Sequence, residues 1–368
     1  MAVCDLEKKF TFDFWRNMIK QRQSNFELLR IVSMVLIVLH HFGYYAPDTA
    51  GNPIKTGVLL LLAWGGKLGV NLFILISGYM TACSTFKARS LLRVVFETVF
   101  YSVSILFLFL IFNPTVVDSA SNVVKSFIPC ISSMYWFVTS YIGMVIVSPV
   151  LRSLLKRLSQ EQLCRFLILM LVPLSVIPTF THMDFIVNGF VWLVYLYLVA
   201  GYIRLWGIPW SRRLDYRLIG ICFAVIYISS FVISCACGVR KMPLTAMNSI
   251  FMLCISVCVF RAASELKIGS IPSINMMASG SFAVYLIHEN WLVRKTLWPS
   301  LASIYSSHSI VLLFEGIIFA CALFVACVLF DLMRQRFIEQ PLFRFIDSCL
   351  VGSKLDSFDK WVNSIEGE

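Results

Sequence analysis

Ionisable side chains bracket a largely apolar stretch close to the start of the chain. Arg30 precedes this stretch, and the pair His40-His41 follows it. At 100° per helical residue, the eleven steps from Arg30 to His41 return to within about 20° of the same helix face, whereas His40 points roughly 80° away. The same steps separate Arg30 from His41 by roughly 16 Å along the axis. The spacing therefore predicts that Arg30 and His41 serve opposite ends of one elongated ligand.

The residue types indicate the chemistry at each end. A guanidinium group binds phosphate or carboxylate oxygens, and a neutral imidazole can accept a proton as a general base. We therefore predict Arg30 as an anion-binding residue and His41, rather than His40, as a catalytic base. The alternative is that Arg30 extends to the lipid headgroups while the two histidines cap the far end of the helix.

Two further ionisable residues lie inside apolar runs. His288 falls about nine residues into the run 279–299, with Ser281 seven residues back on the same helix face. We predict a substrate-binding role for His288, and an interhelical hydrogen bond is the alternative. Glu315 has no nearby cation in the sequence, so it is protonated, paired with another helix or facing water. We include Glu315 among the predicted substrate-binding residues.

Polar and aromatic residues near the ends of other apolar runs complete the predicted site. Ser77 either lines the substrate path or, with the following glycine, lets helices approach closely. Trp136 binds substrate or belongs to an interfacial aromatic belt. Lys87, Arg89 and Arg93 form a basic cluster that either binds an anionic ligand with Arg30 or anchors the chain at the membrane surface.

These residues are positioned by helices long enough to cross a bilayer. Of the 368 residues, 59% are hydrophobic and only 14% are charged, which excludes a soluble globule. The apolar residues form repeated runs of about twenty, the length that spans a membrane. We predict ten transmembrane helices, at 26–46, 60–83, 93–112, 131–151, 163–181, 185–205, 217–236, 244–262, 279–299 and 310–332.

The distribution of Lys and Arg predicts the orientation of these helices. Alternate loops and the two ends of the chain carry 24 of the 31 basic residues on one side and seven on the other. The positive-inside rule then places both termini in the cytoplasm. The net charge of +11 follows from this asymmetry and does not indicate a nucleic-acid partner. For residues 57–83, the same rule favours one span preceded by an interfacial segment over two crossings.

The N-terminal residues and the cysteines are not part of the predicted site. Residues 1–25 are basic without an apolar core, so we expect a surface-lying cytoplasmic lead-in and no cleavable signal peptide. Most of the twelve cysteines lie in apolar runs, where they act as small hydrophobic residues. Their spacing suits neither a disulfide framework nor a Cys/His metal site, and we expect no bound metal.

Five ordered motifs resemble the acyltransferase-3 family of membrane O-acyltransferases, which modify bacterial envelope polysaccharides. The first motif is Glu27-Leu-Leu-Arg30 followed by His41. The others are Gly69 to Tyr79, Trp136 to Pro149, Ser281 to His288 and Ile338 to Leu342, the last containing Glu339-Gln-Pro341. One departure is the basic cluster, because Ser90 stands where the first arginine of the family's Arg-x-x-Arg pair would fall.

This resemblance implies an all-α, polytopic integral membrane protein of the bacterial cytoplasmic membrane. It implies a lead-in at 1–25, an acyltransferase-like transmembrane domain at 26–345 and a cytoplasmic tail at 346–368. The implied reaction moves an acetyl or other small acyl group from acyl-CoA to a hydroxyl of an envelope, capsular or exopolysaccharide glycan, or of a lipid-linked saccharide. Arg30, Lys87, Arg89 and Arg93 would bind the acyl-CoA donor, and we expect no permanently bound cofactor.

Two features limit the possible mechanisms and functions. No Gly-x-Ser-x-Gly motif is present, which favours direct transfer over an acyl-serine intermediate. A transporter or flippase of a lipid-linked glycan is the alternative function, because several helices are interrupted by Pro or Gly. That function predicts internal repeat symmetry, and the sequence contains none that we can detect.

Overall fold

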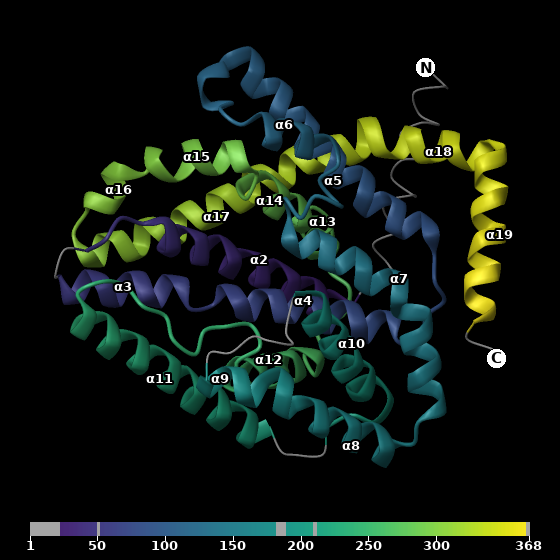
Figure 1. Ribbon diagram of the computed structural model, residues 1–368, viewed down its shortest axis with the longest axis horizontal. Helices are drawn as coiled ribbons and strands as arrows, with labels where there is room; N and C mark the ends of the chain where they lie inside the picture. Colours follow the sequence, from purple (N-terminus) through teal and green to yellow (C-terminus); the bar gives the residue numbers. More distant parts are fainter. Residues whose placement is uncertain (1–22, 50–51, 182–188, 209–211, 366–368) are drawn as a thin grey trace.

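The structure is a computed structural model that describes residues 23–49, 52–181, 189–208 and 212–365. Residues 1–22, most of the predicted N-terminal lead-in, lie outside the described residues. The described chain is built from helices and contains no β-strand (Figure 1). This confirms the prediction of an all-α fold.

Eight helical segments in the described ranges are long and apolar enough to cross a membrane, which confirms a polytopic membrane protein. Five of these segments are unbroken helices: α2 (Ser24–Tyr45), α5 (Ala88–Phe112), α7 (Trp136–Arg157), α10 (Gly189–Trp206) and α11 (Arg212–Cys237). The other three segments are composite and are described next.

The composite spans join short helices end to end. The first joins α3 (Pro53–Ala63) to α4 (Gly66–Thr81). The second joins α8 (Gln160–Leu171) to α9 (Ile177–Thr181) through the π-turn η2 (Val172–Val176). The third joins α17 (Ser309–Arg334) to α18 (Gln340–Ser348) through the π-turn η3 (Gln335–Glu339). Pro173 and Pro341 lie in or directly after the π-turns, as expected because proline cannot donate the α-helical hydrogen bond.

The predicted span 279–299 is not one helix. It is divided into α14 (Ser281–His288) and α15 (Trp291–Ser300), and the chain breaks at Glu289-Asn290. The Asn290 side chain accepts a hydrogen bond from the backbone N–H of Leu292 and so starts a new helix. The predicted span 244–262 corresponds to α12 (Ile250–Ser264), an apolar helix of 15 residues. Of the ten predicted spans, eight correspond to helical segments of spanning length in the described ranges, and the other two correspond to α12 and to the pair α14 and α15.

The segment predicted to precede the second span at the membrane interface is helical. The segment is the helix α3, whose Leu59 and Leu60 are fully buried. Asn52 caps this helix and Pro53 occupies its first turn. The chain turns slightly at Trp64-Gly65 and continues as α4. Gly66 packs directly against α2, because a side chain there would overlap that of His40.

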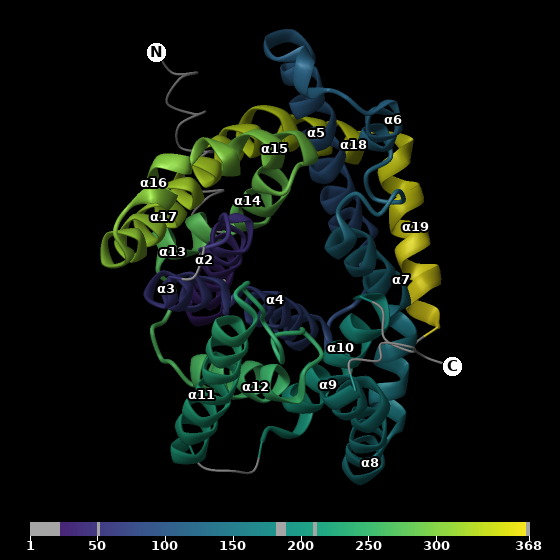
Figure 2. The same ribbon diagram turned by 60° about the vertical axis from the view of Figure 1, so that its left-hand side comes forward.

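The helices α2, α3 and α4 form the centre of the molecule. Figure 2 shows them between α14 and α17 above and α11 and α12 below, and these helices contact one another as the view suggests. Apolar side chains from α2, α4, α10 and α14 contribute nearly half of the buried residues of the main core. The polar residues described below project from this packed centre.

Short helices cover the two ends of the central bundle. At the end where α2 finishes lie the 3₁₀-turn η1 (Pro114–Val116), α6 (Ala120–Phe127), α15 and α16 (Ala302–Ser306). At the other end, α13 (Pro272–Ser279) contacts the start of α2, and α19 (Leu350–Ser364) packs beside α5. The predicted tail thus continues as helix through Ser364, and Asp359 and Asn363 bond to the backbone of Ala88 and Phe86.

Candidate functional site

Three cavities lie side by side, each sharing lining residues with the next, and two of them are lined by residues of α2. The inner cavity is lined by Lys87 and Arg152, and it shares Ser77, Val94 and Tyr141 with the middle cavity. The middle cavity contains Arg30. It shares three aromatic residues, Phe73, Phe137 and Phe282, with a third cavity that is lined by His40 and His41. Arg30 and His41 thus line neighbouring cavities that share these three aromatic residues.

The path narrows toward the histidines. The inner and middle cavities have volumes of about 210 and 220 Å³, whereas the histidine cavity has about 40 Å³. The three shared phenylalanines form the walls where the path becomes narrow. A long, flexible ligand could extend along this path, and its tip would end beside an imidazole.

His41 contacts a second histidine across the bundle. Its Nδ1 lies 3.0 Å from Nε2 of His288 on α14. Nδ1 of His288 lies close to the carbonyl oxygen of Val284, which can only accept a hydrogen bond, so that Nδ1 carries the proton. Nε2 of neutral His288 is then an acceptor, and Nδ1 of His41 must donate to it. The hydrogen-bond network thus assigns a free lone pair to Nε2 of His41.

Glu289 completes this cluster. Its Oε1 lies 3.5 Å from Nδ1 of His41, and its Oε2 lies 3.7 Å from a guanidinium nitrogen of Arg294. A carboxylate at this position would stabilise a positive charge on the His41 ring. Sequence analysis missed Glu289, because it treated residues 279–299 as one continuous helix. The acidic residue directly after a buried histidine was the available signal.

His40 lies in the same cavity but has different partners. Its Nδ1 donates to the carbonyl oxygen of Ala63, and its ring stacks on Tyr44. Lys67 lines the same cavity, and its Nζ lies 5.5 Å from the ring centre of Trp136. Trp136 is thus placed beside the histidines. His41 is the histidine of the pair whose ring nitrogen lies beside both the His288 imidazole and the Glu289 carboxylate.

Arg30 faces the middle cavity as part of an ion pair. Its guanidinium donates hydrogen bonds of 2.8 and 3.0 Å to the carboxylate of Glu27, one helical turn earlier. Ser77 on α4 lines both the middle and the inner cavity. The structure therefore brings Arg30 and Ser77 together along one path.

The basic cluster divides between two locations. Lys87 lines the inner cavity, whereas Arg89 pairs with Asp347 and Asp356 near the end of the chain. The hydrogen bond from Arg89 holds the pKa of the exposed Asp356 carboxyl below its usual range. Arg93 lies over the ring of Phe343, also on the C-terminal side. Arg89 and Arg93 do not line any of the three cavities.

A buried arginine that sequence analysis did not select lines the inner cavity. Arg152 on α7 is 2% exposed and donates to the hydroxyl of Ser148, one turn earlier. In the sequence it looked like one of several basic residues at the end of an apolar run. The Ser148-Pro149 pair before it was part of a recognised motif, but nothing in the spacing showed that Arg152 points inward.

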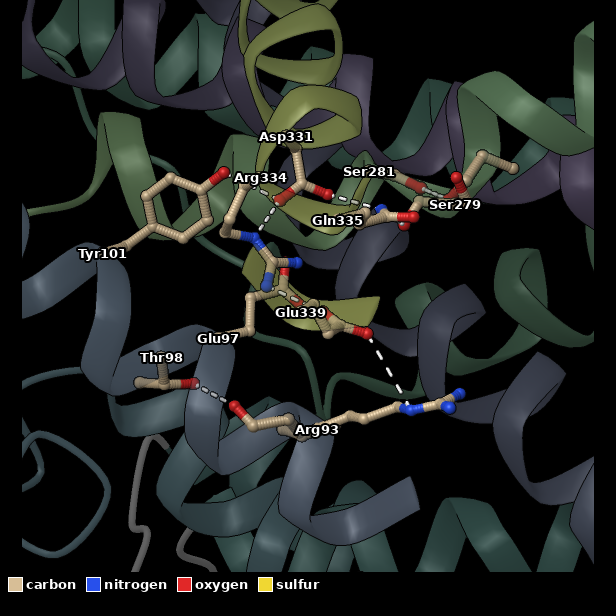
Figure 3. Close-up of polar contacts among 12 residues, drawn as sticks. Arg93, Glu97, Thr98, Tyr101, Ser279, Ser281, Asp331, Arg334, Gln335 and Glu339 are labelled. Carbon is tan, nitrogen blue, oxygen red and sulfur yellow. Dashed lines mark hydrogen bonds and ion pairs between the residues drawn. The ribbon is translucent and has the colours of Figure 1, made fainter. Parts of the chain in front are cut away.

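A network of buried charges forms the wall behind the middle cavity (Figure 3). Arg334 on α17 is bonded to Asp331 and Glu339 and lies 3.6 Å from Glu97 on α5. Tyr101 on α5 donates to Asp331 at 2.7 Å. Glu97 also lines the middle cavity, so the network fixes α5 against α17 beside Arg30. It also gives Glu339, known from the sequence only through its motif, a structural partner.

Glu315 lies apart from these residues. It is half-buried on α17, and its Oε2 atom has no hydrogen-bond partner among the described residues. It lines none of the three cavities. Its predicted role in substrate binding stays a prediction.

Comparison with known protein families agrees with this arrangement. The family model of the acyltransferase-3 group, described as an acyltransferase domain, matches residues 23–331. This range covers most of the chain and includes Arg30, His41, His288 and Glu289. No curated protein and no solved structure matches the chain. The chain belongs to the acyltransferase-3 family, and it is a membrane acyltransferase.

Proposed function

We propose that this acyltransferase moves an acetyl or other small acyl group from acyl-CoA to a hydroxyl of an envelope, capsular or exopolysaccharide glycan, or of its lipid-linked precursor. The observation that carries the proposal is the path of three adjoining cavities, with basic residues at its inner end and His41 at its narrow end. An elongated donor with a charged head and a reactive tip matches both ends of that path.

The donor's phosphates would bind at the inner end. Lys87 and Arg152 line the inner cavity, and Arg30 lines the next one, which shares Ser77, Val94 and Tyr141 with it. Guanidinium and ammonium groups bind phosphate oxygens through charge-assisted hydrogen bonds. Arg89 and Arg93 would act indirectly, by holding the C-terminal helices beside the entrance. The thioester end of the donor would then extend past the three phenylalanines toward His41.

His41 would act as the general base. Its Nε2 accepts the proton of the acceptor hydroxyl while the hydroxyl oxygen attacks the thioester carbonyl carbon. The carbon–sulfur bond then breaks, and the leaving thiolate takes the proton from His41, which restores the neutral imidazole. His288 fixes the tautomer of His41, and Glu289 stabilises the imidazolium that forms between these two steps. The roles match those of a base and its orienting groups in other acyl-transfer sites.

Orientation in the membrane would separate the two substrates. The excess of Lys and Arg on alternate loops supports cytoplasmic termini, with the inner cavity opening toward the cytoplasm, where acyl-CoA is found. The histidine end would then lie in the outer half of the membrane. A bacterial cytoplasmic membrane provides both acyl-CoA on one side and envelope glycans on the other.

The proposal is tested with purified protein in lipid nanodiscs and with intact cells. We expect the protein to consume radiolabelled acetyl-CoA and His41→Gln to lose that activity at equal purity. Mass spectrometry of envelope glycans from cells with and without the gene should show acetyl esters that depend on it. Unchanged glycan acylation together with no acyl-CoA consumption would refute the proposed function.

A further inference from the structure

His41, His288 and Glu289 have the geometry of a metal-binding site. One ligand atom from each residue can be chosen so that all three lie within 4.8 Å of one another. Two of these separations are 3.0 Å, between the two imidazole nitrogens, and 3.5 Å, between His41 Nδ1 and Glu289 Oε1. Two ligands that each lie about 2.0–2.2 Å from a tetrahedral zinc ion are roughly 3.3–3.5 Å apart. The third separation, between His288 and Glu289, lies within the same 4.8 Å.

The groups around the cluster orient its ligand atoms inward. Nδ1 of His288 is bonded to the Val284 carbonyl, which leaves its Nε2 lone pair directed at His41. A hydrogen bond from the other ring nitrogen to a backbone carbonyl is typical of metal-binding histidines. Arg294 lies near Oε2 of Glu289, while the buried Oε1 has no hydrogen-bond partner among the described residues. Oε1 is therefore the oxygen available to an ion.

The cluster is distinct among the residues that could bind a metal. In the part of the chain that the structure describes, no other group of three His, Cys, Asp or Glu side chains comes this close together. Residue spacing did not indicate this cluster, because His41 and His288 are separated by 247 positions and the spacing rules apply to neighbouring residues. Two histidines and one glutamate are also a known donor set for zinc sites that keep one open position.

We propose that His41, His288 and Glu289 bind a divalent transition-metal ion of the zinc class, and that the bound ion inhibits the enzyme. A neutral imidazole that binds a metal through Nδ1 carries its remaining proton on Nε2. Nε2 of His41 then cannot accept a proton from the acceptor hydroxyl. The ion also displaces His41 from its hydrogen bond with His288. The inhibition rests on the proposed function of His41, whereas metal binding by the cluster does not.

Metal binding is tested without turnover. Purified full-length protein in nanodiscs is stripped with EDTA and titrated with Zn²⁺ in competition with a chromophoric chelator. We expect one tight site per chain, weakened at least tenfold in His288→Gln and in Glu289→Gln but unchanged in His308→Gln, whose histidine is exposed at the start of α17. Co²⁺ in the same site should lack a thiolate charge-transfer band, because no cysteine belongs to the cluster.

Inhibition is measured on the same samples. Stoichiometric Zn²⁺ should abolish acetyl transfer by the wild-type protein and by His308→Gln, and EDTA should restore it. Absence of a stoichiometric site, or a site of equal affinity in His288→Gln and Glu289→Gln, would overturn the metal site. Binding with unchanged or increased activity would overturn the inhibitory role. If metal-free protein shows no transfer, the proposed function fails while the binding titration still decides the site.

Discussion

Replacing Glu289 with glutamine tests whether a carboxylate supports the base, because the substitution removes the charge and keeps the side-chain shape. In the structure, Oε1 of Glu289 lies 3.5 Å from Nδ1 of His41. The carboxylate should stabilise the transition state as the imidazole gains positive charge. We predict that Glu289→Gln lowers kcat while leaving the KM for acyl-CoA nearly unchanged, since Glu289 lies at the far end of the path from the basic residues.

The size of the effect follows from the separation of the charges. At an effective dielectric constant of about 20, unit charges at the observed separation attract by about 4.7 kcal/mol. With half a unit of positive charge on His41 at the transition state, the loss is about 2.4 kcal/mol, or about 60-fold in kcat. Arg294, 3.7 Å from the other oxygen, offsets part of the carboxylate charge that acts on His41, so the predicted factor is an upper estimate.

The assay is acetyl transfer by purified protein in EDTA-containing buffer, so that no bound ion alters the comparison. Glu161→Gln provides the control, because its carboxylate pairs with Arg165 on the exposed surface of α8. We expect the control to retain wild-type kcat. If Glu289→Gln retains kcat within threefold while His41→Gln is inactive, the carboxylate does not support the base. A raised KM with unchanged kcat in Glu289→Gln would also refute the role of this carboxylate in stabilising the transition state.

Three further predictions concern stability, donor binding and topology. Arg334→Met should lower the free energy of unfolding by about 3–5 kcal/mol, because it leaves buried carboxylates without a cation. The control Arg165→Met, at an exposed position, should lower it by about 0–1 kcal/mol, and equal losses for the two variants in denaturation curves would contradict this prediction. Arg30→Ala should weaken equilibrium binding of a non-hydrolysable acyl-CoA by about 10-fold or more, as expected for lost charged hydrogen bonds. His41→Ala should bind the same acyl-CoA nearly as well as the wild type, and equal weakening in both variants would refute the two-ended path. Reporter fusions after Glu368 and within residues 113–130 should report cytoplasmic and external locations respectively, and an external signal at Glu368 would refute the predicted orientation.

Much of the fold could be predicted because bilayer-length apolar runs are a strong signal. The starts and ends of α2, α5, α7 and α10 lie within a few residues of the predicted ones. The failures occurred where local side-chain bonds override the apolar pattern. Asn290 starts a new helix inside an apolar run, and Gly66 lets α4 pack closely on α2. Hydropathy contains neither kind of information.

The site was predictable only along a single helix. Helical periodicity related Arg30 to His41, and the structure places the two residues on neighbouring cavities that share three phenylalanines. Contacts between distant segments were not accessible from one sequence, so the pairing of His41 with His288 and Glu289 was missed. The same limit applies to the basic residues, since spacing alone could not show that Arg152 faces the inner cavity while Arg89 binds the C-terminal helices.

The central claim is that Nε2 of His41 accepts the proton of the acceptor hydroxyl, and the adjacent histidine provides a matched control. The most direct measurement compares glycan O-acetylation in cells that express His40→Gln or His41→Gln at equal protein abundance. His40 donates only to a backbone carbonyl, so His40→Gln should retain most of the acetylation. His41→Gln should lose it by about 10²–10⁴-fold, as expected for removal of a general base. Active His41→Gln with inactive His40→Gln would contradict the assignment of the base.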